Sequence, residues 1–302
     1  MQTEATASAV AAGRRVLLGL IGSGIQASLT PAMQMREARE HGLQLHYQLI
    51  DLDRTAQGSE CLPELIDAIR TIGFDGFNVT FPCKQAVIPL LDDVADDARA
   101  IGAINTVVLQ GSRLIGHNTD CSGWRWGFER QLPEADLGRV VLIGAGGAGS
   151  AIGEALMTMG CQQLSIVDTE HDRARALAQG LARRHHHPIT AGSLGELPAL
   201  MKRASGLVHA TPIGMVKLPG SPIDPQLLTS RHWVSEVVYF PIETELIKAA
   251  RERGCPVSDG GGMAVGQAIG AFEIFTGLRA DPRRVAEHFS MLLNAQASDR
   301  SD

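Results

Sequence analysis

The segment Val140 to Gly149 constrains the fold of this chain more than any other. It places three glycines in the spacing GxGxxG, directly after an apolar run and at the start of a helical pattern. The first glycine permits a tight turn, the second lets the backbone approach a pyrophosphate, and the third lets helix and strand pack closely. The helix amino end then offers free amides and partial positive charge to phosphates. In this context we expect a dinucleotide loop rather than a plain tight turn, formed by Gly144, Ala145, Gly146, Gly147, Ala148 and Gly149.

The residue at the end of the next apolar run bears on which dinucleotide is bound. Asp168 stands about twenty residues after the glycines, where a carboxylate can accept both ribose hydroxyls. A 2′-phosphate about 4 Å from this carboxylate would be repelled by roughly 4 kcal/mol per unit charge at an effective dielectric of 20. NAD is therefore expected over NADP. Glu170 adds to the negative field, whereas Arg173 and Arg175 lie close enough in sequence to offset it, unless they only cover an exposed helix face. We include Arg173 among the cofactor-binding candidates.

Short β-branched and leucine-rich runs alternate with amphipathic stretches along the whole chain, which is typical of the α/β class with parallel sheets. We expect strands at Val16 to Ile21, Leu45 to Asp51, Gly76 to Val79, Ile104 to Leu109, Val140 to Ile143, Leu164 to Val167, Gly206 to Ala210 and Trp233 to Val238. We expect helices to open at Thr30-Pro31, Ala148 and Asp172, and to cover roughly Ala264 to Thr276 and Pro282 to Asn294. At Thr30-Pro31, threonine can cap the orphan amides and proline suits the first helical position.

Length, charge and cysteine content narrow the class of protein. With 302 residues, 44% of them hydrophobic, the chain exceeds the length at which one core usually divides into two. A net charge of −6 disfavours a nucleic-acid partner and favours a small molecule. No apolar run approaches the roughly 20 residues that span a bilayer, and the alanine-rich start, Met1 to Gly13, lacks a signal-peptide layout, so we expect a loose tail on a cytoplasmic protein.

Metal and nucleophile sites are not expected. The five cysteines are scattered and are predicted to be reduced, and the triplet His185-His186-His187 is predicted to be a solvated loop, because tandem histidines do not converge on one ion. We find no Ser-His-Asp layout with a nucleophile elbow and no phosphate loop ending in Gly-Lys-Ser.

Eight clusters follow one another in an order that points to one family. They are Ser28 to Met33, Asn78 to Lys84, Gly102 to Thr106, Gly116 to Asp120, the glycine loop, His209 to Met215, Val238 to Thr244, and Gly262-Met263 followed by Gln267-Ala268. Together they resemble the shikimate dehydrogenase family over nearly the whole chain. The resemblance implies a substrate-binding α/β domain (residues 1–119 and 263–302), a Rossmann NAD-binding domain (residues 120–262), and carboxy-terminal helices that return to the first domain.

The resemblance also implies roles for particular residues. Ser28 and Thr30 match hydroxyls that hold the substrate carboxylate. Tyr239 matches a substrate-side tyrosine, Met215 a residue near the nicotinamide, and Thr211 and Gly262 positions beside the cofactor. The residues that match those around the ring hydroxyls of the substrate are Asn78, Thr80, Lys84, Asn105, Asp120 and Gln267.

The chemistry can be argued from the residues themselves. Oxidising a secondary alcohol removes a hydride from carbon and a proton from oxygen, so a base must stand at the right distance. The amine of a lysine has a pKa of about 10.4 in water, burial lowers such a value and a nearby carboxylate raises it. We predict that Lys84 exchanges the proton while Asp120 orients and tunes the ammonium. The alternatives are an exposed residue at a helix start for Lys84, a helix cap for Asp120, and turn or capping duty for Ser28 and Asn105.

Four departures from the family pattern carry information. Thr30 replaces a second serine, and Val167-Asp168-Thr169 replaces an Asn-Arg-Thr run. Both resemble the quinate/shikimate dehydrogenase branch that prefers NAD and serves breakdown of quinate, and the methyl of Thr30 can reshape the pocket for the saturated quinate ring. His209 stands where the family usually has asparagine, and Glu236 where it usually has aspartate.

The sequence therefore predicts an NAD(P)-dependent oxidoreductase that interconverts quinate with 3-dehydroquinate and shikimate with 3-dehydroshikimate. One alternative is a shikimate-specific NADP enzyme of aromatic amino acid biosynthesis, or an enzyme acting on a related polyol acid. Another is a noncatalytic module that senses NAD or a metabolite, against which the presence of both Lys84 and Asp120 argues. The expected partner is the small-molecule acid, and a homodimer stays open as an assembly.

Overall fold

The computed structural model describes residues 13–298 of the chain, so the predicted tail falls outside it except for Gly13. These residues divide into two compact units. The first comes from residues 13–119 and 268–298, and the second is the continuous segment Asp120–Gln267. Each unit contains its own six-stranded sheet, which confirms the α/β class.

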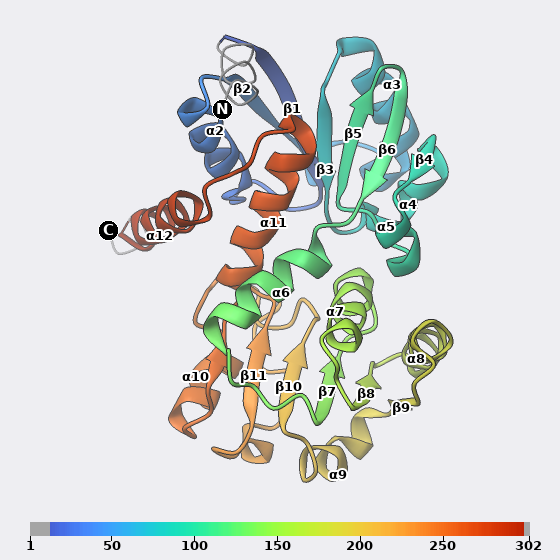
Figure 1. Cartoon of the computed structure of the whole chain (residues 1–302), viewed down its shortest axis with the longest axis vertical. Helices are drawn as coiled ribbons and strands as arrows, with labels where there is room; N and C mark the ends of the chain where they lie inside the picture. The colour runs from blue at the N-terminus through green and yellow to red at the C-terminus, as the bar shows by residue number, and fades with distance from the viewer. Residues whose placement is uncertain (1–12, 299–302) are drawn as a thin grey trace, which may run out of the picture. The chain divides into compact units, whose positions relative to one another are not determined.

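The sheet of the first unit has the order β2-β1-β3-β5-β6-β4 (Figure 1). Its strands are β1 (Arg15–Gly22), β2 (Gln44–Asp51), β3 (Gly76–Val79), β4 (Asp93–Val94), β5 (Thr106–Gln110) and β6 (Arg113–His117). Strand β1 pairs in parallel with β2 and β3, whereas β5 pairs antiparallel with both β3 and β6. The expectation of parallel strands is therefore wrong for this half of the sheet. A turn at Gly111, whose φ is +65°, joins β5 to β6 directly and needs no crossover helix.

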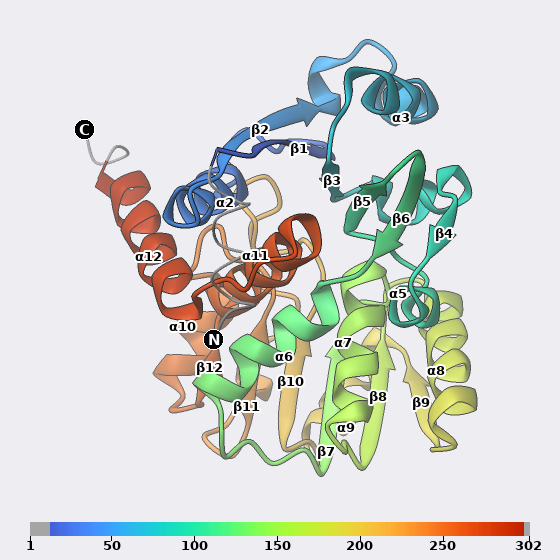
Figure 2. The same ribbon diagram turned by 45° about the horizontal axis from the view of Figure 1, so that its top comes forward.

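Helices cover both faces of the first sheet, as Figure 2 shows for α2 and α3. They include α2 (Thr30–Glu40), α3 (Leu62–Ile72), α4 (Cys83–Ala86), α5 (Asp96–Ile101) and the last helix of the chain, α12 (Pro282–Ser298). The core beneath α3 contains Ile66 and Ile69 of that helix with Phe77 and Val107 of the sheet. The last helix packs against α2, as the family resemblance implies.

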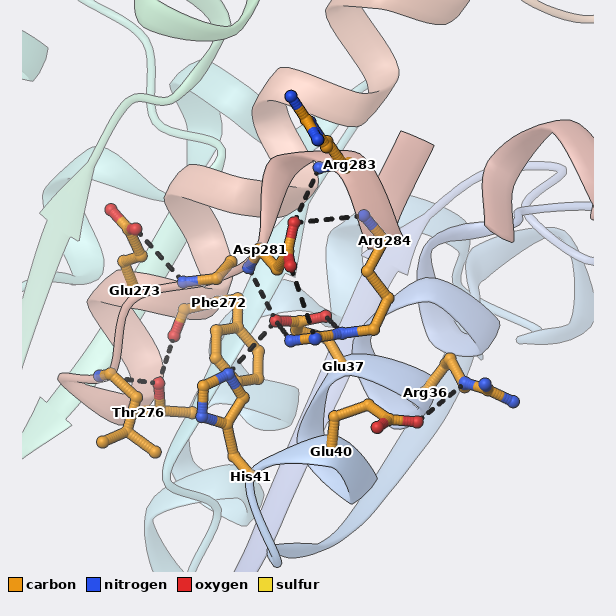
Figure 3. Close-up of polar contacts among 12 residues, drawn as sticks. Arg36, Glu37, Glu40, His41, Phe272, Glu273, Thr276, Asp281, Arg283 and Arg284 are labelled. Atoms are coloured by element: carbon orange, nitrogen blue, oxygen red, sulfur yellow. Dashed lines mark hydrogen bonds and ion pairs between the residues drawn. The ribbon is translucent and has the colours of Figure 1, made fainter. Parts of the chain in front are cut away.

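A buried carboxylate joins α2 to the start of α12 (Figure 3). The side chain of Glu37 is only 2% exposed. Arg284 donates from Nε to one carboxylate oxygen at 2.7 Å and from Nη2 to the other at 2.6 Å. The backbone amide of Asp281 donates at 2.8 Å, and Nε2 of His41 lies 3.1 Å away. Burial raises the pKa of Glu37, but the bonds from Arg284 and Asp281 outweigh it, so that the pKa lies below its usual value.

The second unit has a wholly parallel sheet in the order β12-β11-β10-β7-β8-β9. Its strands are β7 (Arg139–Ile143), β8 (Gln163–Val167), β9 (Ile189–Gly192), β10 (Gly206–His209), β11 (Trp233–Glu236) and β12 (Val257–Ser258). Chain order reverses between β7 and β10, and in open α/β sheets the ligand crevice forms at the carboxyl ends of two such strands. Ligands of open α/β sheets bind at such a point.

Two layers of helices enclose this second sheet. On one face lie α6 (Asp120–Gln131), α7 (Gly147–Thr158) and α8 (His171–His185), and on the other α9 (Leu197–Met201) and α10 (Glu245–Glu252). Helix α11 (Gly260–Thr276) begins in the second unit, and its part from Ala268 onward belongs to the first. Here α6 and α11 approach closely at glycines, because a Cβ on Gly127 would lie 2.5 Å from Gly262 and one on Gly123 would lie 2.7 Å from the backbone of Gln267.

Two local predictions are wrong. Thr30 does not cap α2, because it is the first helical residue, Leu29 stands at the cap, and Ser28 Oγ instead accepts from the amide of Thr30 at 3.3 Å. The histidine triplet is not wholly a solvated loop either. His185 ends α8 and its Nε2 lies 2.8 Å from Glu154. None of the five cysteines, all of which lie within residues 13–298, forms a disulfide.

Candidate active site

The glycine loop lies at the crevice of the second sheet. Gly144 has a φ of +105°, and a Cβ there would lie 2.6 Å from the carbonyl oxygen of Ala210. A Cβ on Gly149 would lie 2.0 Å from the carbonyl oxygen of Gly144, so the third glycine lets α7 start against the turn. Gly146 is exposed, and no described atom lies within 4 Å of its Cβ position. The open space at the second glycine fits a pyrophosphate, whose approach requires bare backbone.

Asp168 follows β8 and meets this loop. Its Oδ2 accepts from the amide of Ala145 at 2.7 Å, and its Oδ1 accepts from the amide of Glu170 at 2.9 Å. The two arginines near it in sequence are engaged elsewhere. Arg173 lies 3.0 Å from Glu170 and Arg175 lies 2.9 Å from Asp172, and all four side chains are at least 60% exposed. The carboxylate of Asp168 is therefore the charge fixed at the edge of the loop.

Thr211 and Met215 lie in the segment that follows β10. The methyl carbon of Thr211 would be 2.9 Å from a Cβ on Gly144, so this residue packs directly against the glycine loop. Met215 is 43% exposed, and its neighbours Val216 and Leu218 are also exposed. The residues flagged as departures, His209 and Glu236, form a fully buried pair beneath this segment.

Asp120 and Gln267 meet within the second unit. Asp120 is the first residue of α6 and is fully buried, and Gln267 Nε2 donates to its Oδ1 at 2.6 Å. The structure thus brings together one predicted catalytic residue and one predicted substrate-binding residue. Tyr239 is half-buried in the segment after β11. Gly262 is buried at the crossing of α6 and α11, where a Cβ would lie 2.8 Å from Gly127, so its contacts are those of helix packing.

A buried polar network in the first unit contains two predicted substrate residues. Asn78 accepts from the hydroxyl of Tyr47 at 2.7 Å and donates to the carbonyl oxygen of Asn105 and to Thr106 Oγ1, both at 2.9 Å. Asn105 in turn donates to Thr119 Oγ1 at 3.0 Å and accepts from the amide of Thr119 at 2.9 Å. Burial raises the pKa of the Tyr47 phenol, so the hydroxyl stays protonated and can donate.

Sequence reasoning missed Tyr47, although a signal was present. A tyrosine in the middle of a predicted strand buries its ring and needs a partner for its hydroxyl. Asp51, at the end of the same strand, was also missed. It accepts from the amide of Gly24 at 3.0 Å and from Gln26 Nε2 at 2.9 Å, and so fixes the segment that leads to Ser28. Burial raises the pKa of Asp51, but these bonds outweigh it and lower the value.

Two more predicted residues of the first unit follow β3. Thr80 and Lys84 are half-buried, and Lys84 lies in the short helix α4. The carbonyl oxygen of Lys84 accepts from the amide of Ile104 at 2.8 Å, which holds α4 against the segment that contains Asn105. Lys84 belongs to the first unit and Asp120 to the second.

The parallel sheet with its crevice, the open glycine turn and the acidic residue after the second strand of the Rossmann order define a dehydrogenase that uses a nicotinamide dinucleotide. Among residues 13–298, no helix has the length and apolar character that crossing a membrane requires.

Comparisons with known proteins agree with this class and specify the family. The family model for the shikimate dehydrogenase substrate binding domain matches residues 20–107, and the model for shikimate / quinate 5-dehydrogenase matches residues 128–214. The chain belongs to the shikimate dehydrogenase family, and it is an oxidoreductase.

Three known proteins are similar along nearly their whole length. The chain is 50% identical to the shikimate dehydrogenase (NADP(+)) of Pseudarthrobacter chlorophenolicus, over 93% of this chain and 96% of that one. It is 45% identical to the quinate/shikimate dehydrogenase (NAD(+)) of Corynebacterium efficiens, over 92% and 98%. The solved structure of quinate dehydrogenase from Corynebacterium glutamicum in complex with NAD has a TM-score of 0.86 and 44% identity, over 92% of this chain and all of that one.

Proposed function

We propose that this enzyme oxidises a ring hydroxyl of quinate and of shikimate with NAD, giving 3-dehydroquinate and 3-dehydroshikimate. In this proposal the first unit binds the acid and the second binds the dinucleotide. The observation that carries the choice of NAD is Asp168, whose carboxylate is fixed beside the glycine loop by the amides of Ala145 and Glu170.

Overall identity does not separate the two cofactors, since relatives of both kinds are about equally similar to the chain. Local charge supports the choice of NAD. A 2′-phosphate in the place of a ribose hydroxyl would meet the carboxylate of Asp168, and neither nearby arginine is directed to compensate, because Arg173 and Arg175 pair with acidic residues of their own helix region. With NAD, the same carboxylate can accept hydrogen bonds from two ribose hydroxyls.

We assign the proton transfer to Lys84 and Asp120. Bound NAD would supply the acceptor for the hydride of the carbinol carbon. The chain must accept the hydroxyl proton, and we assign this step to the amine nitrogen of Lys84. Asp120 orients that amine, and its own orientation is fixed by the bond from Gln267 to Oδ1. Ser28 and Thr30 offer hydroxyl donors to the substrate carboxylate from the start of α2.

The polar network behind Asn105 gives the acid site its rigidity in this proposal. The side-chain amide of Asn78 forms hydrogen bonds with Tyr47, Asn105 and Thr106. We therefore assign Asn78 a positioning role rather than a direct contact with the substrate ring. Thr80, Lys84 and Tyr239 are half-buried, and we assign them to contacts with the acid. Gly262 is better assigned to the packing of α6 and α11 than to the cofactor.

A matrix of four steady-state measurements tests the function. Quinate and shikimate are each supplied with NAD and with NADP, and the appearance of reduced dinucleotide is followed by absorbance. We expect turnover of both acids with NAD, and a kcat/KM for NAD about a hundredfold above that for NADP. Equal or better rates with NADP and shikimate alone would instead identify the shikimate-specific enzyme. Binding of dinucleotide without turnover of either acid would favour a sensing module.

A further inference from the structure

A buried histidine–glutamate pair lies at the crevice of the dinucleotide-binding sheet. His209 ends β10 and Glu236 ends the neighbouring strand β11, and the two residues are partners in the register of these strands. Nδ1 of His209 lies 2.9 Å from Oε1 and 3.0 Å from Oε2 of Glu236. Both side chains are completely buried. None of the roles proposed above uses either of them.

The contacts of Glu236 determine which way the histidine faces. Its Oε1 accepts from the amides of Val237 at 2.8 Å and Val238 at 3.0 Å, and its Oε2 accepts from Thr244 Oγ1 at 3.2 Å. Both oxygens of Glu236 act as acceptors in these contacts, so we assign the hydrogen of the contact with His209 to Nδ1. The other ring nitrogen, Nε2, is thereby left for the hydroxyl of Thr211, 2.5 Å away.

Thr211 transmits this arrangement to the glycine loop. Its methyl carbon packs against Gly144, since a Cβ on that glycine would lie 2.9 Å from it. Its Oγ1 accepts a hydrogen bond from the amide of Ile213 at 3.3 Å. A second contact supports the same segment, because a Cβ on Gly214 would lie 3.3 Å from the methyl carbon of Thr244. Both ends of the buried pair therefore hold the segment after β10 against the first glycine of the loop.

Stability alone does not account for a pair of this kind. Replacing two buried, hydrogen-bonded polar side chains by apolar residues of similar volume is often neutral or stabilising, because the desolvation of the polar groups offsets their attraction. An apolar pair would fill the same space, but it would offer no directed bond to Thr211. The polar side chains at this site are explained if the bond from His209 is needed to hold Thr211 in one orientation.

We propose that His209, oriented by Glu236, is a positioning residue that fixes Thr211 beneath Gly144 and thereby sets the affinity for the dinucleotide. The inference rests on the proposed cofactor site. It adds to that site two residues that do not touch the cofactor and act through Thr211.

Two substitutions of His209 separate its two bonds. The amide of asparagine reaches only the place of Nδ1, so His209→Asn keeps the bond to Glu236 and loses the one to Thr211. The amide of glutamine reaches the place of Nε2, so His209→Gln keeps a partner for Thr211. We expect His209→Asn to raise the Kd for NADH, and the KM for NAD, about fivefold to tenfold. The KM for the acid should change less than about twofold, and His209→Gln should restore at least half of the lost affinity on a logarithmic scale.

Variants of Thr211 test the same chain of contacts without disturbing the buried pair. Thr211→Val keeps the methyl against Gly144 and removes the hydroxyl, whereas Thr211→Ser keeps the hydroxyl. We expect Thr211→Val to weaken NADH binding about as much as His209→Asn. The double variant that combines His209→Asn with Thr211→Val should bind NADH no more weakly than either single variant, because both substitutions remove the same hydrogen bond.

A matched control is His232, another buried histidine of the second unit. Its Nδ1 accepts from the amide of Thr229 at 3.1 Å and its Nε2 lies 3.0 Å from the carbonyl oxygen of Met201. His232→Asn should lower the melting temperature and leave the Kd for NADH unchanged.

The Kd is measured by NADH and NADPH fluorescence without any acid, so that it does not depend on the identity of the substrate. An unchanged Kd for NADH in His209→Asn and Thr211→Val, with only a lower melting temperature, would overturn this inference but not the proposed cofactor site. Wild-type protein that binds neither reduced dinucleotide would overturn the cofactor site and this inference together. If His209→Asn does not fold, the two Thr211 variants decide.

Discussion

Replacing Asp168 by asparagine should change the cofactor preference of the enzyme, because it removes a charge while keeping the shape of the side chain. The carboxylate accepts from Ala145 through Oδ2 and from Glu170 through Oδ1. Asparagine retains one acceptor oxygen, so one of these two amides keeps its bond and the other faces an NH₂ group. The loop is therefore weakened by about one hydrogen bond, or about 1 kcal/mol.

The effects on the two dinucleotides have opposite signs. A unit charge about 4 Å from the carboxylate is repelled by about 4 kcal/mol at a dielectric of 20, and because Asp168 is half-exposed we take about half of this, about 2 kcal/mol. Binding of NADP should then improve by about 2 kcal/mol, less the loss in the loop. Binding of NAD loses the charged acceptor of its ribose hydroxyls, worth about 1.5 kcal/mol or more, in addition to the same loss in the loop. The ratio of specificity constants should shift toward NADP by about two to three orders of magnitude.

The assay is the kcat/KM for NAD and for NADP at saturating acid, in the wild type and in Asp168→Asn. The loop cost is common to both dinucleotides and cancels in the ratio. Asp172→Asn is the control, since its carboxylate pairs with Arg175 and is 87% exposed, and such surface pairs contribute little. Its ratio should change less than about threefold. An equal fall for both dinucleotides in Asp168→Asn would refute the electrostatic reasoning, because a merely structural residue would behave in this way.

Three further predictions concern the acid site and the stability of the first unit. Lys84→Ala should lower kcat by about a hundredfold to ten-thousandfold with an unchanged Kd for NADH, and substantial residual turnover would contradict its role as base. Thr30→Ser removes one methylene-sized group worth about 0.8 kcal/mol, so the quinate to shikimate ratio of kcat/KM should shift about fourfold, and an unchanged ratio would count against the pocket argument. Glu37→Gln should lower the free energy of unfolding in urea by about 3 kcal/mol at pH 7, because it leaves the guanidinium of Arg284 without its buried partner. The folded-state pKa of Glu37 is lowered, so the wild type loses this stabilisation as the pH falls from its unfolded pKa through the folded one. The difference between wild type and variant should therefore shrink at acid pH, and a difference independent of pH would show that the charge is not responsible.

Features determined by a few consecutive residues were predictable from the sequence. The glycine loop is such a case, since its turn, its open second glycine and its close helix contact each depend on the glycine at that position. Other locally determined features are the first strands, the helix start at Thr30-Pro31 and the position of Asp168 after β8. In each case the residue pattern and the geometry it requires lie within about ten positions of one another.

Features that depend on distant partners were not predictable. The antiparallel pairing of β5 with β6 was missed because a turn at Gly111 and Ser112 lacks the strong signal of an Asn-Gly or Asp-Gly pair. The role of Tyr47 depends on Asn78, on another strand, and the packing of Gly262 depends on Gly127, on another helix. His209 and Glu236 were recognised as unusual, but their pairing follows from the register of β10 and β11.

The bond between Glu37 and Arg284 joins positions 247 apart, and this separation orders events during synthesis. A chain emerging at about 5–20 residues per second presents Glu37 well before Arg284 has been translated. The intervening segment Asp120–Gln267 is continuous and has all of its own strands by then. The second unit can therefore fold on the ribosome before the first unit is complete, because Glu37 of α2 lacks its bonds from Arg284 until the last helix arrives.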